Sequence, residues 1–84
     1  MWLVVDRIEE KNVVLQDDGE LLYTLSVEDY TAMAGEAPAE SLVLDAQVAD
    51  GRILSLTPSP KETERRLAAA RERLHRLVAR RNKQ

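Results

Sequence analysis

The sequence predicts a mainly β fold of the α+β type: a small five-stranded antiparallel barrel or curled sheet, followed by one long C-terminal α-helix. Over residues 1–58, short β-branched and apolar runs alternate with polar or Gly-bearing turns. From residue 59 the pattern becomes helical and basic, without a breaker through Arg81. A chain of 84 residues is one small domain, so the helix at 59–84 is expected to belong to the same domain as the barrel.

The apolar runs predict five strands, at residues 2–8, 13–16, 21–25, 42–48 and 52–56. A polar turn joins the first two strands. Asp18-Gly19 and Asp50-Gly51 are expected to form two-residue hairpin loops of type I′, in which both residues need positive φ. Because side chains alternate across a strand, Leu44 is expected to enter the core and Val43 to point away from it.

Residues 26–41 carry weaker signals. Ser26 followed by Asp29 is typical of a capping box, so a short helical turn is expected to start there. Residues 35–38 (Gly-Glu-Ala-Pro) indicate a loop.

The start of the long helix is the strongest local signal. Ser59 is a preferred N-cap, Pro60 fits the first helical position, and Glu62 can reach back to the N–H of the cap. An apolar stripe of about 100° follows. Its members are Thr63, Leu67, Ala70, Leu74, Leu77 and Val78.

Two heptads are too few for an independent coiled coil, so the stripe must be buried against the barrel, a partner copy, or both. We expect Leu67, Ala70 and Leu74 to be mostly buried. The helix spans about 35 Å, against a barrel diameter of about 25–30 Å, so it should overhang by a turn or two. Leu77 and Val78 lie near the overhanging end, and this favours a homodimer.

Charge divides the chain in two. Residues 1–60 hold three cations and twelve carboxylates, a net of −9, and residues 61–84 hold nine cations and three carboxylates, a net of +6. An acidic β body therefore carries a basic helical tail. We expect the basic flank of the helix to meet acidic barrel surface, either its own or that of a partner copy.

The sequence offers no candidate catalytic residue, metal site or cofactor site, so a non-enzymatic protein is expected. There is no Cys, and His75 is the only histidine, on the flank of the helix. The three glycines are isolated, which excludes a phosphate-binding glycine loop. The acidic run 17–20 lacks the spacing of an EF-hand, and the hairpin turn explains it.

Asp6 and Arg7 interrupt the first strand. Strict alternation would place Arg7 on the face of Leu3 and Val5, and Asp6 on the opposite face. One charged side chain is therefore expected near the core. An ion pair, or a carboxylate that bonds loop N–H groups, is the simplest explanation, and contact with a ligand is the alternative.

The basic helix is also a candidate nucleic-acid surface. Arg66, Arg73 and Arg80 recur at seven-residue spacing, and Arg76 adds to them. The net negative charge of the chain, with a pI of about 5.1, and the shortage of aromatic residues argue against nucleic-acid binding. In the alternative, the arginines pair with carboxylates of the helix and of the barrel.

The segment Val4-Val5-Asp6-Arg7-Ile8-Glu9, followed by Val14-Leu15 and a Gly-bearing turn, resembles the start of domain of unknown function 3006. That family comprises short bacterial proteins that end in a charged helix rich in Glu and Arg. This chain departs from the family pattern in the middle. A Leu-Pro segment becomes Leu25-Ser26, and a Glu-Gly-Asp-Val segment becomes Glu40-Ser41-Leu42-Val43.

The resemblance implies an accessory role without a known activity. Family members are sometimes encoded near hydrolases of the metallo-β-lactamase type, which implies such a hydrolase as a protein partner. The resemblance also singles out Asp6, Arg7 and Glu9 as motif residues of unknown role.

We therefore expect a cytoplasmic interaction or oligomerisation module, with no membrane segment and with a homodimer as its assembly. The alternative is a weak nucleic-acid-binding accessory protein. The candidate interaction surface lies on the helix and consists of Arg66, Arg73, Arg76, Leu77, Val78 and Arg80.

Overall fold

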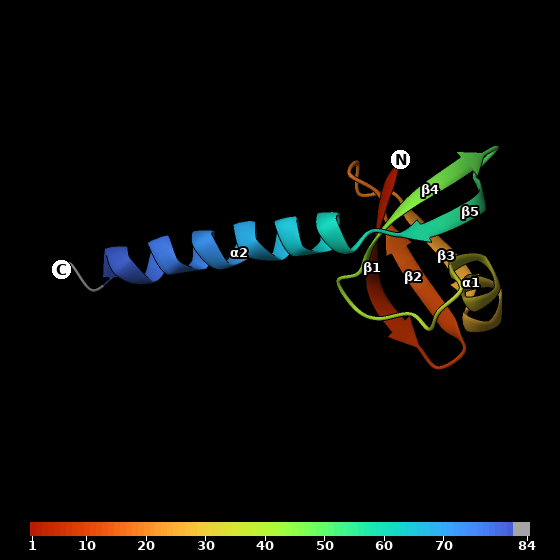
Figure 1. The fold of residues 1–84 in the computed structure, drawn as a ribbon, viewed down its shortest axis with the longest axis horizontal. Helices are drawn as coiled ribbons and strands as arrows, with labels where there is room; N and C mark the ends of the chain where they lie inside the picture. Colours follow the sequence, from red (N-terminus) through yellow and green to blue (C-terminus); the bar gives the residue numbers. More distant parts are fainter. Residues whose placement is uncertain (82–84) are drawn as a thin grey trace.

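The structure, a computed structural model, describes residues 1–81, with side-chain surroundings through residue 78. In chain order its elements are β1 (Trp2–Glu9), β2 (Asn12–Gln16), β3 (Leu22–Ser26), α1 (Val27–Ala34), β4 (Val43–Ala49), β5 (Arg52–Pro58) and α2 (Pro60–Arg81). The predicted fold class is confirmed: five antiparallel strands form a curled half-barrel sheet, and a long C-terminal helix follows (Figure 1).

The strand order is β3-β2-β1-β4-β5, and neighbouring strands are antiparallel. The sheet curls without closing, so β3 and β5 are its two edges. Helix α1 contacts both edge strands and β2, and thus covers the open side of the half-barrel. α1 is a full eight-residue helix where the sequence predicted only a turn; Ser26 caps it by accepting the Asp29 N–H at 3.0 Å.

The core lies inside the curl of the sheet, under α1. Its buried members among the described residues are Leu3, Val5, Val13, Leu15, Tyr30, Leu44, Ala46, Ile53 and Leu56. Leu44 faces this core and Val43 lies outside it, as predicted, but Val43 is nevertheless buried, since it is only 1% exposed. The first turn of α2 packs against β4 at Val43, which accounts for its burial.

A β-bulge at Asp6 corrects the prediction for the first strand. Val5 pairs with Leu15 and Arg7 pairs with Val14, so Asp6 is an extra residue with no partner on β2. The extra residue reverses the alternation, and both charged side chains reach solvent, Asp6 at 39% and Arg7 at 52% exposure. The expected charge near the core is therefore absent at this position.

One of the two hairpin predictions is wrong. Asp50 and Gly51 form the two-residue loop with φ of 53° and 75°, as predicted. Between β2 and β3 the loop has five residues, 17–21, and its positive φ falls on Glu20, at 69°, rather than on Gly19. The Asp17 carboxylate organises this loop by accepting the N–H groups of Gly19 at 2.8 Å and Leu21 at 2.9 Å.

Helix α2 points away from the sheet, so the molecule is elongated (Figure 1). Its principal extents are 50 × 25 × 21 Å and its radius of gyration is 15.2 Å. A compact chain of this length would have a radius of gyration of about 12 Å. The predicted overhang of a turn or two was therefore too small, since α2 contacts the sheet only near its base, at β4.

The prediction that Leu67, Ala70 and Leu74 are mostly buried is wrong for the single chain. Leu67 is 37% exposed and Leu74 is 63% exposed, and Ala70 is also exposed. Periodicity identified the face of the helix correctly, but the helix does not lie on the barrel. Burial of the stripe against the barrel, one of the two predicted possibilities, therefore does not occur in the single chain.

Candidate interaction surface on the C-terminal helix

The hydroxyl of Thr63 bonds the base of α2 to β4. It accepts a hydrogen bond from a strand N–H, as a backbone carbonyl does in a β ladder. Thr63 Oγ1 accepts the Val43 N–H at 2.8 Å and donates to the Ser59 carbonyl at 2.8 Å. The Ser59 N–H donates to the Val43 carbonyl at 2.9 Å. Both backbone groups of Val43 are thus used, as in a β ladder, and the direction of α2 relative to β4 is set.

The predicted N-cap is confirmed, because Ser59 Oγ accepts the Glu62 N–H at 3.3 Å. The predicted return contact from Glu62 to the cap does not form. The Ser59 N–H is already bound to Val43, and the Glu62 carboxylate binds arginines instead.

Glu62 is the centre of a charge cluster at the base of the arm. Arg65 and Arg66 each donate from Nε to this carboxylate at 3.0 Å, and its side chain is only 12% exposed. These hydrogen bonds, from Arg65 first and Arg66 second, lower the pKa of Glu62 to about 2. Arg66 also donates to Asp18 at 3.3 Å, which ties the base of α2 to the loop 17–21.

Beyond this base, the apolar stripe of α2 is open to solvent. Leu74, Leu77 and Val78 are 63%, 57% and 49% exposed. By helical spacing they share one face with Leu67 and Ala70. We use "the stripe" below for Leu67, Ala70, Leu74, Leu77 and Val78.

Basic side chains flank the stripe. Arg76 pairs with Glu72 at 2.6 Å and Arg71 approaches Glu64 at 3.8 Å, so the expected pairing with helix carboxylates is present. Arg73 is exposed and makes no ion pair with the part of the chain described. Of the predicted surface residues, Arg80 lies outside those whose side chains are described. The structure brings Arg66 to the base of α2 and leaves Arg73, Arg76, Leu77 and Val78 on the free part of the arm.

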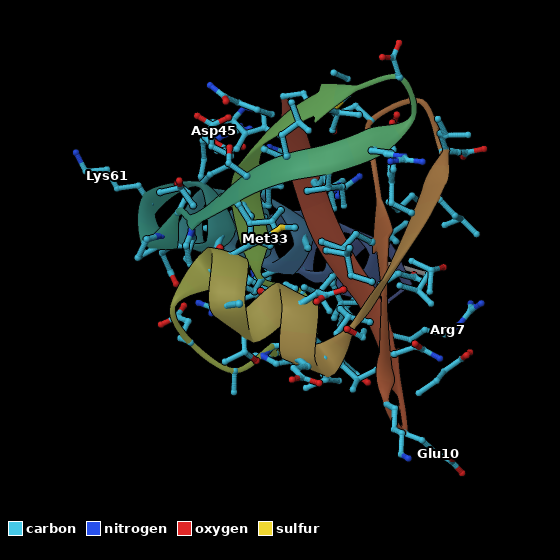
Figure 2. The ribbon with its side chains drawn as sticks, turned by 90° about the vertical axis from the view of Figure 1, so that its right-hand side faces the viewer. Arg7, Glu10, Met33, Asp45 and Lys61 are labelled. Carbon is cyan, nitrogen blue, oxygen red and sulfur yellow. The ribbon has the colours of Figure 1, made fainter. Side chains whose placement is uncertain are left out.

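The motif residues Asp6, Arg7 and Glu9 form a separate cluster. Arg7 binds Glu9 at 2.6 Å and Asp6 at 3.3 Å, as expected for an ion pair. Figure 2 shows Arg7 on the opposite side of the body from Lys61, which lies in the first turn of α2. The motif therefore does not contribute to the surface on α2.

Two shallow cavities lie on the body. One, of about 350 Å³, sits between the edges of β3 and β5 and is lined by Leu22, Tyr23, Thr24, Leu25, Gly51, Arg52 and Ile53. The other, of about 420 Å³, is lined by Glu10, Lys11, Ser26, Val27 and Glu28. The first has no nucleophile with an adjacent base, and Ser26 in the second is occupied as the cap of α1.

Metal ligation finds no support in residues 1–81, where no three His, Cys, Asp or Glu side chains converge. Over the same residues, neither helix combines the length and the apolar character that a bilayer crossing requires.

Sequence reasoning missed the roles of Thr63 and Asp18 at the base of α2, and that of Tyr30 in the core. Thr63 was grouped with the apolar stripe, but it holds α2 on β4. Asp18 was assigned to a tight turn, but it binds Arg66. Tyr30 is fully buried, and burial, followed by the charge of Glu36, raises its pKa to about 12.

Comparisons with protein-family models, with curated proteins and with solved structures found no match for this chain.

Proposed function

We propose that this chain is a non-enzymatic interaction module in which the curled sheet holds α2 as a projecting arm and the stripe is the binding surface. One observation carries the proposal: large apolar side chains are exposed along one face of a helix whose base is bonded to the sheet. An apolar helical face of this kind is typical of a helix that binds a partner.

A second copy of this chain is the first partner we propose. The two copies would bury the same stripe, and a twofold-symmetric dimer is the simplest closed assembly. The stripe offers no group for chemistry, which favours binding over catalysis.

The accessory role in a bacterial cell rests on the resemblance to domain of unknown function 3006, and a cytoplasmic location is proposed because the chain has no cysteine. One structural observation supports the match. Ser41 has a φ of 69°, in the left-handed region that favours glycine, and it stands where the family pattern has Gly. A hydrolase of the metallo-β-lactamase type is a further partner on the same ground.

Sedimentation equilibrium tests the proposal on the full chain. We expect the wild type to exceed the mass of a monomer at about 100 micromolar, and Leu74→Glu/Leu77→Glu to remain monomeric. The control, Ala68→Glu/Ala69→Glu, adds the same charge to exposed positions outside the stripe and should still associate. A monomeric wild type, or loss of association in the control alone, would contradict the proposal.

Nucleic-acid binding is the second candidate, and the exposure of Arg71, Arg73 and Arg76 favours it. Against it, Arg65, Arg66 and Arg76 already pair with carboxylates of the helix. Retention on duplex DNA that falls steeply with salt, and that Arg73→Gln/Arg76→Gln abolishes, would favour this candidate.

A further inference from the structure

We propose that α2 pairs antiparallel with α2 of a second copy of this chain, so that the basic distal half of each arm lies beside the nearly neutral base and the acidic loop 17–21 of the other. This inference rests on the proposed function and deepens it, because it fixes the orientation and the register of the partner.

The stripe defines a register. Leu67 and Leu74 occupy a positions of a heptad, and Ala70 and Leu77 occupy d positions. In an antiparallel pair, Leu67 can face Leu77 of the second copy while Ala70 faces Leu74 of the second copy. Each layer then combines an a residue with a d residue, and the small Ala70 leaves room for a leucine opposite it.

Charge selects the antiparallel direction. Residues 71–84 hold six cations and one carboxylate, a net of +5, whereas residues 61–70 hold three cations and two carboxylates, a net of +1. A parallel pair would place the two +5 halves side by side. An antiparallel pair places each +5 half beside the nearly neutral base of the other arm.

The acidic loop 17–21 also favours the antiparallel direction of the helix pair. Asp18 contacts Arg66, which occupies a g position beside the stripe, so the loop lies along that flank of α2. In Figure 1 this loop, in orange, lies at the end of the body from which α2 leaves. In the antiparallel arrangement the distal part of α2 of the second copy passes this loop, so the positive charge of that arm lies near the loop carboxylates.

The same loop and the first residue of β3 supply apolar surface. Leu21 and Leu22 are 58% and 50% exposed, next to the acidic residues. The paired helices alone bury less than the roughly 800 Å² per partner of a standard interface. Contact between the tip of one arm and the loop of the other would enlarge the interface with both apolar and charged groups.

One feature opposes the pairing. Arg73 occupies a g position near the centre of the stripe, so the two copies of Arg73 would face each other across the twofold axis. This repulsion limits the affinity, and we expect Arg73→Gln to tighten the dimer by a few fold. In a parallel pair Arg73 would lie beside Val78, so the same substitution would relieve only the general repulsion between the two basic halves and would tighten the dimer less.

Disulfide trapping tests the orientation, and the chain has no native cysteine to interfere. We expect a mixture of Ala70→Cys chains and Leu74→Cys chains to form a mixed disulfide dimer. Each variant alone should crosslink poorly, because identical positions in this register are displaced by about 6 Å along the helices, or four residues of rise.

Salt and charge reversal test the loop contact. Asp18→Lys should raise the dimer dissociation constant about tenfold at low salt, since two equivalent charge contacts become repulsive. Glu28→Lys makes the same charge change in α1, on the far side of the body from α2 (Figure 1). This variant should change the dimer dissociation constant by less than about twofold.

The outcomes separate the two proposals. A mixed disulfide together with the loop effect supports the antiparallel dimer. Efficient crosslinking of Ala70→Cys alone, or equal effects of Asp18→Lys and Glu28→Lys, would overturn this orientation while the interaction module stands. A wild type that stays monomeric would overturn both.

Discussion

Tyr30 is a fully buried core residue, and its hydroxyl makes no hydrogen bond within the described structure. Burial is therefore also the main cause of its raised pKa. The ring contributes to the core, whereas the hydroxyl costs free energy because it has left water without gaining a partner.

We predict that Tyr30→Phe leaves the free energy of unfolding unchanged or raises it by about 1 kcal/mol, because it removes an unpaired buried group and keeps the ring. Urea unfolding, monitored by circular dichroism, measures this difference. A loss of more than about 1 kcal/mol would show that the hydroxyl has a partner in solution.

Glu62 should give a pH-dependent contribution to stability. Its pKa is lowered to about 2 by the hydrogen bonds from Arg65 and Arg66. The folded state therefore binds this proton less tightly than the unfolded state, whose Glu pKa is about 4.3. The ion pairs stabilise the fold fully above pH 4.3, and their contribution is lost as the pH falls towards 2.

Thermal unfolding of the wild type and of Glu62→Gln at several pH values tests this sign. We expect the variant to be less stable at pH 7 and the difference to vanish near pH 2. A stability difference between the wild type and the variant that stays constant across this pH range would mean that the arginines do not bind the Glu62 carboxylate.

At the scale of elements, the decisive contact joins α2 to β4. The Thr63 hydroxyl accepts from one strand and donates to the residue that caps the helix. This dual role explains why α2 leaves the sheet at a defined angle although it contacts so little of it.

We predict that Thr63→Val costs about 1–3 kcal/mol of unfolding free energy, because the Val43 N–H loses its partner in a part-buried place. The variant has nearly the same shape as the wild type, so packing is little changed. Thr63→Ser keeps the hydroxyl and serves as the control. Equal stability of Thr63→Val and the wild type would mean that water replaces the hydroxyl at no cost.

Leu74→Ala should have little effect on the monomer. The side chain is 63% exposed, so we predict a loss below about 0.5 kcal/mol in dilute solution. The matched core substitution, Leu44→Ala, should cost about 2–5 kcal/mol, because Leu44 is fully buried. A large cost of Leu74→Ala at concentrations where the protein is monomeric would mean that the arm folds back onto the body.

At the scale of the whole molecule, the acidic body and the basic arm are held apart. Arg66 and Asp18 make an ion pair between them at the base of the arm. Beyond this contact, residues 67–78 of α2 are exposed, so the basic arm projects from the acidic body rather than lying on it.

Small-angle scattering extrapolated to low concentration tests this shape. We predict a radius of gyration near the 15.2 Å of the extended form. A folded-back arm would give about 12 Å, the value for a compact chain of this length. Thr63→Val should broaden the distribution of distances, because it frees the base of the arm.

The sequence by itself determined the five strands and the long C-terminal helix, but not the full extent of α1 or the loop between β2 and β3. Short-range signals located the strands, the hairpin at Asp50-Gly51 and the start of α2 at Ser59, because turn chemistry and capping act over a few residues. The same signals identified the face of α2 that carries the stripe, since helical periodicity is also local.

Only the tertiary structure decided where that face lies. The contacts that direct α2 join Thr63 to Val43 across 20 residues and Arg66 to Asp18 across 48 residues, and no local pattern encodes them. The bulge at Asp6 likewise arises from the register of β1 against β2 rather than from the composition of β1. Periodicity says which residues share a face, but long-range packing decides whether that face is covered, and here it leaves the stripe exposed to solvent.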